Sequence, residues 1–434
     1  MVSFLNHEYQ LRINKTTSQK KYKNQNKEDF RKAKINNNSE FLIPNSEFKK
    51  TGGFFNMSYN IDQYCDHFRK LLEAQLERAD RMEKNADRTD FTTKEKIIIG
   101  VIGGDGIGPI IVDEARRVAQ KLLADKIADG KIEIREIEGL TIENRLEKNQ
   151  PVPTDVLAAI KECDVLLKGP TTTPKGGTME SANVTLRREL DLYANVRPVC
   201  VPEENIDWIF YRENTEGEYV LGSSGFEVPD KLAFDFKVTT NAGTKRIARA
   251  AFEYAKANGK TSVSIVTKAN IMKKTDGKFS LICNEIASEY PEINAEEWYI
   301  DIMAANLVNR DIRSKFQVFV LPNLYGDIIT DEAAQIQGGV GTAGSANIGD
   351  RYAMFEAIHG TAPRMIEEGL GSFANPQSIL KALAMLLRHI GLSEKAQILD
   401  DAMAEIDAEG KIILTGTKDG NTCREYGDAL IAKL

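Results

Sequence analysis

Two aspartates, Asp327 and Asp331, stand where a divalent metal could be bound. They follow an apolar run, residues 316–321, that is typical of a buried strand, and Asn323 and Gly326 mark its end before a helical pattern begins. Side chains four residues apart lie on one face of a helix, so the two carboxylates could share a hard cation such as Mg²⁺ or Mn²⁺. The alternative is that Asp327 is a helix N-cap and Asp331 a solvated acid of the first turn.

Three arginines, Arg187, Arg197 and Arg212, occur close to one another in the sequence, together with hydroxyl and amide side chains. A guanidinium group binds a carboxylate through two parallel hydrogen bonds, so this set favours a small polycarboxylate as the ligand. Tyr219 follows shortly and could serve as a proton donor. The competing interpretation of the first arginine segment is a solvated basic helix face.

Several single residues carry weaker signals. Lys268 follows a predicted strand at 263–266, and Asp301 interrupts an apolar pattern, but a lone lysine is usually a surface residue and a lone aspartate usually a cap. His359 and Asn375 lie in loops of small residues that would let a flat ring approach, and they could hydrogen-bond an adenine and a ribose. A core histidine is the competing interpretation of His359.

The elements that must position these residues alternate between strand-like and helical segments, which predicts a largely parallel sheet covered by helices. Residues 96–102 are typical of a buried strand, and the glycine-rich turn 103–109 leads into the next helix. This turn could cradle a dinucleotide pyrophosphate, but its spacing departs from the usual fingerprint, so a plain tight turn is an equal alternative. The apolar pattern of residues 61–76 predicts an amphipathic helix packed on the body or on a partner subunit.

Composition limits the classes of protein to which the chain can belong. It has 434 residues, of which 42% are hydrophobic and 28% charged, which is ordinary for a globular protein of two lobes. No apolar segment has the length of a membrane span and no secretory signal is visible, so we expect no membrane contact and a cytoplasmic location. The five cysteines are scattered and the four histidines dispersed, so oxygen ligands must bind any metal.

The N-terminal 56 residues differ from the rest. They are rich in Asn, Lys and Ser and carry 11 Lys+Arg against 5 Asp+Glu, and we expect residues 1–56 to be a disordered extension. The remaining chain carries 46 Lys+Arg against 59 Asp+Glu. This acidic body argues against nucleic acid as the main partner.

In their order, the motifs resemble those of the β-decarboxylating dehydrogenases, the family of isocitrate, isopropylmalate and homoisocitrate dehydrogenases. The resemblance covers about residues 96–434, and it is carried by segments 103–109, 168–174, 181–198, 211–219, 268–273, 323–331 and 359–363. It implies an α/β, isopropylmalate dehydrogenase-like fold with a large, mostly parallel sheet. The domains it implies are a coenzyme domain (57–192 and 331–434) and a smaller α/β domain for substrate, metal and dimerisation (193–330) with a clasp excursion at about 217–240.

The same resemblance assigns roles to the candidate site residues. Asp327 and Asp331 would hold Mg²⁺ or Mn²⁺ together with Asp301 from the partner subunit of a homodimer. Tyr219 would protonate the enol carbon, and Lys268, also from the partner, would help to remove the hydroxyl proton. The substrate residues would be Ser181, Asn183, Arg187, Arg197 and Arg212. The coenzyme residues would be Ile107, Lys168, Thr172, Thr173, Asn270, His359, Gly360, Thr361, Ala362 and Asn375.

Substrate and coenzyme are expected from particular positions. Ser181 and Asn183 offer hydrogen bonds to the γ-carboxylate of isocitrate, where isopropylmalate enzymes place apolar residues, so isocitrate is favoured over homoisocitrate, isopropylmalate or a tartrate-like acid. Arg364 argues for the 2′-phosphate of NADP. Against it, Met365 and the segment 412–425 lack the tyrosine and arginine of the bacterial NADP type, so NAD is expected, with NADP as the alternative.

The expected activity is the metal-dependent oxidative decarboxylation of isocitrate to 2-oxoglutarate and CO₂, with hydride transfer to NAD. A hypothesis from another class is a non-catalytic regulatory subunit that binds ligand without turnover. Such subunits typically lose the tyrosine, the lysine or the metal acids, and this sequence has all of them.

Overall fold

The computed structural model describes residues 60–434 apart from 84–87, 175–178, 223, 340 and 342. Residues 1–56, expected to be disordered, lie outside the described part. Ile61–Leu434 form one compact unit. The predicted division of this unit into two domains stays a prediction. No described helix combines the length and the apolar character needed to cross a membrane.

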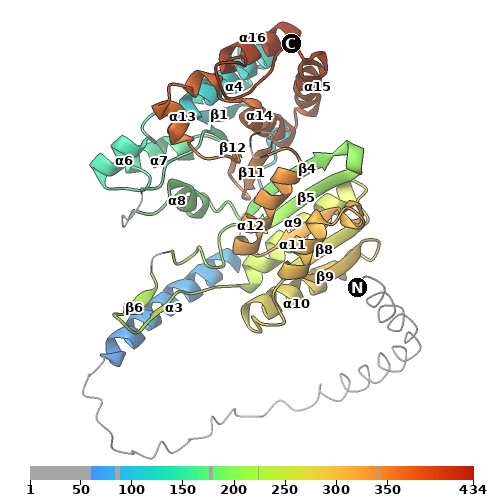
Figure 1. Ribbon diagram of the computed structural model, residues 1–434. Helices are drawn as coiled ribbons and strands as arrows, with labels where there is room; N and C mark the ends of the chain where they lie inside the picture. Colours follow the sequence, from blue (N-terminus) through green and yellow to red (C-terminus); the bar gives the residue numbers. More distant parts are fainter. Residues whose placement is uncertain (1–59, 84–87, 175–178, 223, 340, 342) are drawn as a thin grey trace, which may run out of the picture. The chain divides into compact units, whose positions relative to one another are not determined.

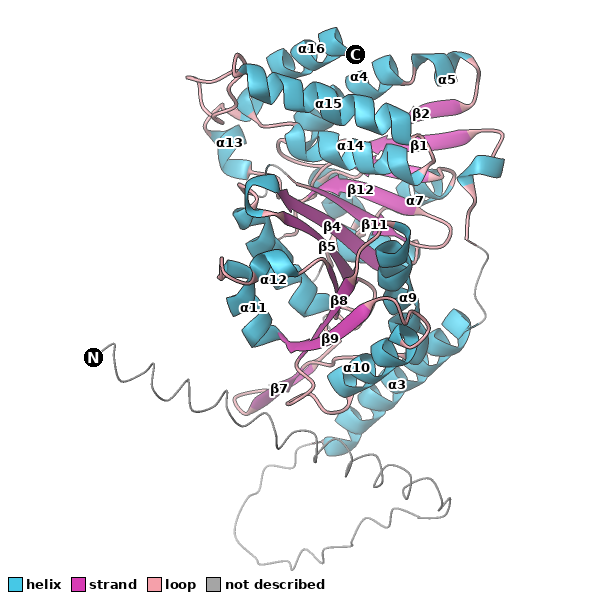
Figure 2. Ribbon diagram, turned by 90° about the vertical axis from the view of Figure 1, so that its right-hand side faces the viewer, coloured by secondary structure: helices cyan, strands magenta, loops and turns pink. Residues whose placement is uncertain are grey.

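A ten-stranded mixed sheet is the frame of the fold (Figure 2). Its strands are β1 (Ile97–Ile102), β2 (Ile132–Glu136), β3 (Val165–Lys168), β4 (Ala194–Val201), β5 (Ile206–Glu213), β8 (Ser262–Thr267), β9 (Asn294–Tyr299), β10 (Val318–Leu321), β11 (Gly344–Ile348) and β12 (Ala353–Ala357). They lie in the order β2-β1-β3-β12-β11-β4-β5-β10-β8-β9. The four strands at each end are parallel, and antiparallel β11 and β4 join the two groups.

Helices cover both faces of the sheet (Figure 1). They are α3 (Ile61–Glu83), α4 (Gly108–Leu122), α5 (Ala124–Ala128), α6 (Ile142–Lys148), α7 (Thr154–Lys161), α8 (Ala182–Glu189), α9 (Asn241–Ala257), α10 (Thr275–Ala287), α11 (Ile300–Val308), α12 (Asn323–Ile336), α13 (Pro363–Glu367), α14 (Gln377–His389), α15 (Ser393–Glu409) and α16 (Cys423–Lys433). Alternate strand residues point to opposite faces. Val320 of β10 belongs to the core beneath α9 and α10, whereas Phe319 and Leu321 belong to the core beneath α11 and α12. The α/β fold class is therefore confirmed.

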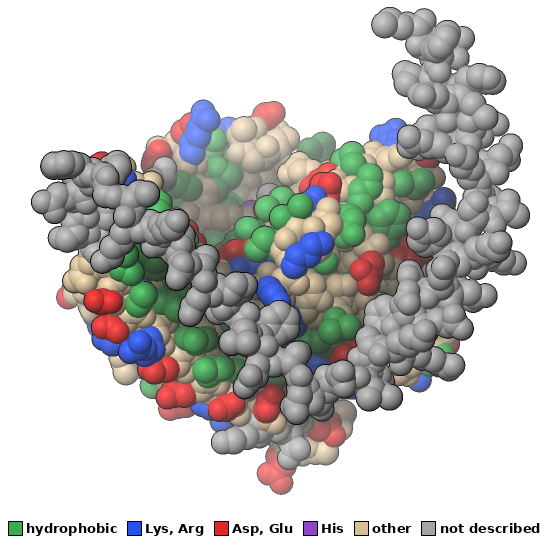
Figure 3. Space-filling view, turned by 90° about the horizontal axis from the view of Figure 1, so that it is seen from below, with side chains coloured by type: hydrophobic (Ala, Val, Ile, Leu, Met, Phe, Trp, Pro, Cys, Tyr) green, Lys and Arg blue, Asp and Glu red, His purple; other side chains and the backbone are tan. Residues whose placement is uncertain are grey.

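The segment expected to form the clasp, about 217–240, contains a small antiparallel hairpin of β6 (Phe226–Val228) and β7 (Leu232–Phe234). Helix α3 packs on this hairpin and on the residues after it. The ring of Tyr64 stacks on that of Phe226 with centroids 4.9 Å apart, and the ring centroids of Phe68 and Phe236 are 5.4 Å apart. Much of the apolar stripe of α3 is nevertheless exposed, with Ile61 65% and Leu76 58% accessible. Figure 3 shows hydrophobic side chains at the surface seen from below, where α3 and β6 lie. The predicted helix exists, but this chain covers only part of its apolar face.

Candidate active site

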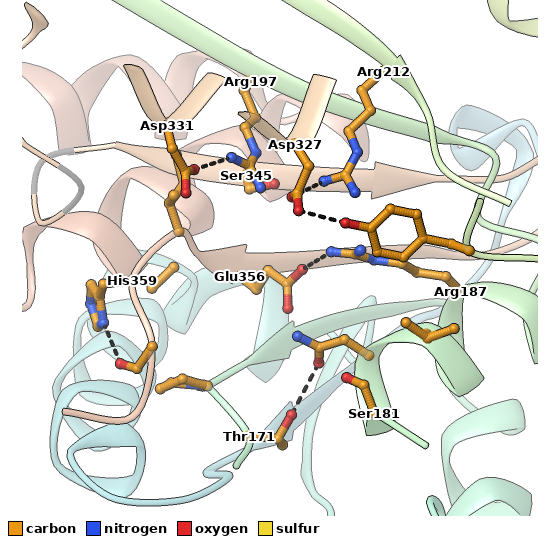
Figure 4. A pocket seen from close by; sticks show the side chains of 17 residues that line it. Thr171, Ser181, Arg187, Arg197, Arg212, Asp327, Asp331, Ser345, Glu356 and His359 are labelled. Atoms are coloured by element: carbon orange, nitrogen blue, oxygen red, sulfur yellow. Dashed lines mark hydrogen bonds and ion pairs between the residues drawn. The ribbon is translucent and has the colours of Figure 1, made fainter. Parts of the chain in front are cut away.

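Helix α12 positions the two aspartates that the sequence singled out. Strand β10 ends at Leu321, Pro322 is the N-cap, and the helix begins at Asn323. Asp327 therefore lies one turn inside the helix. The alternative in which Asp327 is the N-cap is therefore wrong. Asp327 and Asp331 both line a cavity of about 310 Å³ (Figure 4), as the spacing of four residues predicts.

Each of the three predicted substrate arginines reaches the same cavity and pairs with an acid. Arg212 of β5 donates from Nη1 to Asp327 Oδ1 at 2.6 Å, and Arg197 of β4 donates from Nη1 to Asp331 Oδ1 at 2.8 Å. Arg187 of α8 pairs with Glu356 at 3.3 Å between Nη2 and Oε1. The cavity thus holds three guanidinium groups balanced by three carboxylates, and any anion entering it must compete with those carboxylates.

Tyr219 completes the group around Asp327. Its hydroxyl donates to Asp327 Oδ2 at 2.8 Å, and Arg212 Cζ lies 5.5 Å from the centroid of its ring. Burial raises the pKa of Tyr219 to about 12, and the hydrogen bond to Asp327 and the charge of that carboxylate act in the same direction. Burial alone would raise the pKa of Asp327, but the charge of Arg212 and the Tyr219 hydrogen bond lower it overall. At neutral pH a protonated phenol therefore faces an ionised carboxylate.

Ser181 and Asn183 line the cavity at the start of α8. Ser181 is the N-cap residue, but its hydroxyl makes no capping hydrogen bond and remains available to a ligand. The Oδ1 atom of Asn183 accepts from Thr171 Oγ1 at 3.1 Å, which leaves the amide NH₂ group as its donor. Both residues can therefore donate hydrogen bonds within the cavity.

The structure adds Glu356 and Ser345, which the sequence analysis did not assign. The register places Ser345 beside Glu356 and Glu356 beside Lys168, so the three side chains share one face of the sheet. Glu356 Oε1 accepts from Asn347 Nδ2 at 2.8 Å. Burial alone would raise the pKa of Glu356, but the charges of Lys168 and Arg187 lower it. The sequence did contain a signal for Glu356, since it is an ionisable residue inside the otherwise apolar strand 353–357.

Lys168, expected to bind coenzyme, has a fully buried side chain that donates to Gly169 O at 2.8 Å and pairs with Glu356 Oε2 at 3.4 Å. In this structure Lys168 contacts Glu356, which lines the cavity, and its role toward the coenzyme stays a prediction.

Three loops meet beside the cavity and contain several of the predicted coenzyme residues. Ile107 N donates to Thr361 O at 3.1 Å, and Thr172 Oγ1 donates to Thr361 Oγ1 at 3.4 Å. Asp105 Oδ2 accepts from Thr172 N at 2.7 Å. A Cβ atom on Gly106 would lie 2.1 Å from Thr361 O. The glycine-rich turn therefore lets the loops pack closely, and its binding of a pyrophosphate stays a prediction.

Gly106→Ala tests this packing. Gly106 has φ +62°, so alanine meets both backbone strain and the Thr361 carbonyl, and we expect the free energy of unfolding to fall by about 3 kcal/mol. The matched control is Gly130→Ala, since Gly130 has φ +72° but no atom within 4 Å of its Cβ position. The control should lose only about 1 kcal/mol in urea titrations. Equal losses in the two variants would contradict the packing role.

The other predicted coenzyme residues are spread around these loops. His359 and Gly360 line the cavity, and His359 Nε2 is buried without a hydrogen-bond partner among the described residues. Burial lowers the pKa of His359, so the imidazole is neutral and can form a hydrogen bond to a ligand. Ala362 is the left-handed N-cap of α13. Asn375 Oδ1 accepts from Gln377 N at 2.8 Å, while Thr173 and Asn270 are exposed.

Lys268 and Asp301 do not lie among the residues lining this cavity. They pair with each other, with 2.6 Å between Lys268 Nζ and Asp301 Oδ1. The hydrogen bond from Lys268 lowers the pKa of Asp301. Within the described ranges, no three acidic, histidine or cysteine side chains form a complete metal-binding group. One chain therefore brings together two of the three predicted metal ligands, and the contribution of Lys268 and Asp301 across a dimer stays a prediction.

Comparisons with known proteins identify relatives of the chain. Residues 98–430 match the sequence profile described as isocitrate/isopropylmalate dehydrogenase. A regulatory subunit of the mitochondrial NAD isocitrate dehydrogenase of Dictyostelium discoideum is 39% identical over 346 residues, which are 77% of this chain and 91% of that protein. The NADP isocitrate dehydrogenase of Rickettsia prowazekii (strain Madrid E) is 39% identical over 324 residues, 72% of this chain but only 63% of that longer protein.

A solved structure gives the same answer for the fold. The crystal structure of isocitrate dehydrogenase from Methylococcus capsulatus matches with a TM-score of 0.69 and 34% identity, covering 78% of this chain and 99% of that one. The profile match and these relatives confirm the resemblance inferred from the motifs. The chain belongs to the isocitrate/isopropylmalate dehydrogenase family.

Proposed function

We propose that this chain is a catalytic, metal-dependent dehydrogenase that converts isocitrate to 2-oxoglutarate and CO₂ and transfers the hydride to NAD. The observation that carries the proposal is that Tyr219, Asp327 and Asp331 line the same cavity as three arginines. Homoisocitrate and 3-isopropylmalate are the alternative substrates, and NADP is the alternative coenzyme. We place the enzyme in the cytoplasm on the sequence evidence alone.

The charges of the cavity suit a tricarboxylate accompanied by a divalent cation. Asp327 and Asp331 would hold Mg²⁺ or Mn²⁺ with Asp301 of the partner subunit, because carboxylate oxygens are the ligands these ions prefer. With both acids on a metal, Arg197 and Arg212 would lose their present partners and would be free to bind substrate carboxylates. The bound cation would acidify the substrate hydroxyl and stabilise the negative charge left when CO₂ departs.

Tyr219 would return the proton to carbon at the end of the reaction. Its raised pKa keeps the phenol protonated at neutral pH, and its hydroxyl already points at the carboxylate where the substrate and the metal must meet. Lys268 of the partner subunit would help to remove the hydroxyl proton. The active form proposed is therefore a homodimer with shared active sites.

Two observations bear on the finer choices. Ser181 and Asn183 both present donors to the cavity, which supports isocitrate over a substrate with an apolar branch. Arg364, 86% exposed, is paired with Glu368 at 2.6 Å between Nε and Oε1. An exposed ion pair of this kind is weak and leaves the guanidinium available, so the proposal of NAD rests on Met365 and the segment 412–425, which lack the tyrosine and arginine of the bacterial NADP type.

The regulatory-subunit hypothesis is supported by the similarity of this chain to the regulatory subunit from Dictyostelium discoideum. Against it, this chain has Tyr219, Lys268 and all three metal acids, and the cavity brings Tyr219, Asp327 and Asp331 together. A protein that only binds ligand has no need of a proton donor held beside the metal acids. We therefore propose a catalytic role.

The test measures reduction of NAD and of NADP separately with isocitrate, homoisocitrate and 3-isopropylmalate, each with Mn²⁺ and with a chelator. We expect the highest kcat/KM with isocitrate and NAD, and loss of activity on chelation because the metal stabilises the transition state. Binding of isocitrate and Mn²⁺ without reduction of either coenzyme would favour the regulatory role. Turnover that survives the chelator would rule out the proposed mechanism.

A further inference from the structure

Helix α3 precedes the family-matched region, residues 98–430, yet one of its side chains reaches the segment that carries Tyr219. Arg78 Nη1 pairs with Glu216 Oε1 at 3.2 Å, and Nη2 donates to Thr215 O at 3.2 Å. The side chain of Arg78 is 16% exposed, and that of Glu216 is buried. The guanidinium therefore binds both the side chain and the backbone of the turn from 213 to 219, here called the tyrosine turn.

Two buried carboxylates make the tyrosine turn costly to hold in place. Glu213 and Glu216 are each 2% exposed, and Glu213 folds back to accept from Thr215 N and Glu216 N at 2.9 and 2.7 Å. Burial raises the pKa of Glu213 to about 7, and the neighbouring charge of Glu216 acts in the same direction. Glu216 Oε2 accepts from Thr240 N at 2.8 Å, at the N-terminus of α9. A cation beside this pair reduces the repulsion between the two carboxylates.

The other side of the tyrosine turn contacts the cavity. Glu216 O accepts from Asn323 Nδ2 at 3.1 Å, and Asn323 Oδ1 accepts from Arg212 Nε at 3.1 Å and from Arg212 Nη2 at 2.6 Å. Gly217 N donates to Val238 O at 2.8 Å and joins the turn to the segment that follows β7. Tyr219 is three residues beyond Glu216, so a shift of the turn moves its hydroxyl relative to Asp327.

We propose that Arg78 is a positioning residue: from outside the family-matched region it holds the tyrosine turn and thereby places the Tyr219 hydroxyl beside Asp327. This inference rests on the proposed function, in which Tyr219 donates a proton. The competing explanation is that Arg78 only attaches α3 to the body and contributes to stability.

The test compares Arg78→Met with Arg81→Met. Arg81 lies on the same helix, but its side chain is 70% exposed and pairs only loosely, at 3.9 Å, with the exposed Glu77. In Arg78→Met we expect kcat with isocitrate to fall about tenfold, because small displacements of a reacting group are costly, while the KM for NAD changes little. The solvent deuterium isotope effect on kcat should rise, since the Tyr219 proton transfer becomes slower. Arg81→Met should behave as wild type in both measurements.

Two further variants separate positioning from stability. Arg78→Lys keeps the charge but cannot contact Glu216 and Thr215 O together, so it should restore part of kcat. In a Glu216→Gln background, Arg78→Met should cost clearly less than in wild type, because the two residues act as one unit. A lower melting temperature with unchanged kcat and isotope effect in Arg78→Met would overturn the inference, as would equal effects of Arg81→Met.

Hydrogen exchange of the peptide covering residues 213–222 gives a readout that needs no turnover. Faster exchange in Arg78→Met, but not in Arg81→Met, supports the hold on the tyrosine turn, and unchanged exchange overturns it. If the wild-type chain turned over no hydroxy acid, the proposed function would fail while this exchange result still decided the structural part. If the wild type were active and Arg78→Met equalled it in every measurement, the positioning role alone would fail.

Discussion

Tyr219→Phe is expected to lower kcat with isocitrate by about 10²–10⁴-fold, the usual range for loss of a positioned general acid. The substitution removes the hydroxyl that donates to Asp327 Oδ2 at 2.8 Å but keeps the ring beneath Arg212. Substrate binding through the arginines should survive, so the KM for isocitrate should change far less than kcat. Initial rates of coenzyme reduction measure both constants.

The fate of the enol gives a sharper test of the same residue. In D₂O the wild-type enzyme should deliver one deuteron to a single face of the carbon, because the donor is fixed in the cavity. In Tyr219→Phe, solvent must supply the deuteron, so the 2-oxoglutarate formed should be labelled on both faces. The control is Tyr352→Phe, since the Tyr352 hydroxyl donates to Lys161 O at 3.2 Å and does not line the cavity. Full turnover with one-sided labelling in Tyr219→Phe would remove the tyrosine from its assigned role.

Asp327→Asn is the second substitution with a large expected effect, a fall in kcat/KM of about 10³-fold. It removes one anionic oxygen ligand of the proposed metal and also leaves the buried guanidinium of Arg212 without its partner at 2.6 Å. Burial, and then the charge of Arg187, lower the pKa of Arg212 to about 10, but the group is still charged at neutral pH and needs a counter-charge. We therefore expect weaker Mn²⁺ binding together with slower turnover.

Titration with Mn²⁺ in the presence of isocitrate measures the first effect, and steady-state rates at saturating Mn²⁺ measure the second. The matched control is Glu332→Gln, because Glu332 lies on the same helix but does not line the cavity. The control should keep the wild-type Mn²⁺ affinity and rate. If Asp327→Asn bound Mn²⁺ as tightly as wild type, the aspartate would not be a ligand.

Much of the candidate cavity could be predicted from local sequence. Asp327 and Asp331 share a helix face because their spacing matches the helical period, and that relation needs no knowledge of the rest of the chain. The arginines and Tyr219 lie within short segments whose order also identified the family. The strand and helix alternation was sufficient for the α/β class, since hydrophobic periodicity reflects local burial. The start of α12 was misplaced by four residues because Asn323 and Gly326, which resemble loop residues, lie inside the helix.

Contacts between distant parts of the chain were decided only by the tertiary structure. Glu356 pairs with Lys168 because strand β12 lies beside strand β3, although the two residues are 188 positions apart in the sequence. The reach of Arg78 to Glu216 likewise depends on where α3 docks. Local patterns report which face of an element is buried, but they do not report which element covers it. The sequence by itself therefore determined the fold class, the family and most cavity residues, whereas strand register and helix docking determined which charges meet.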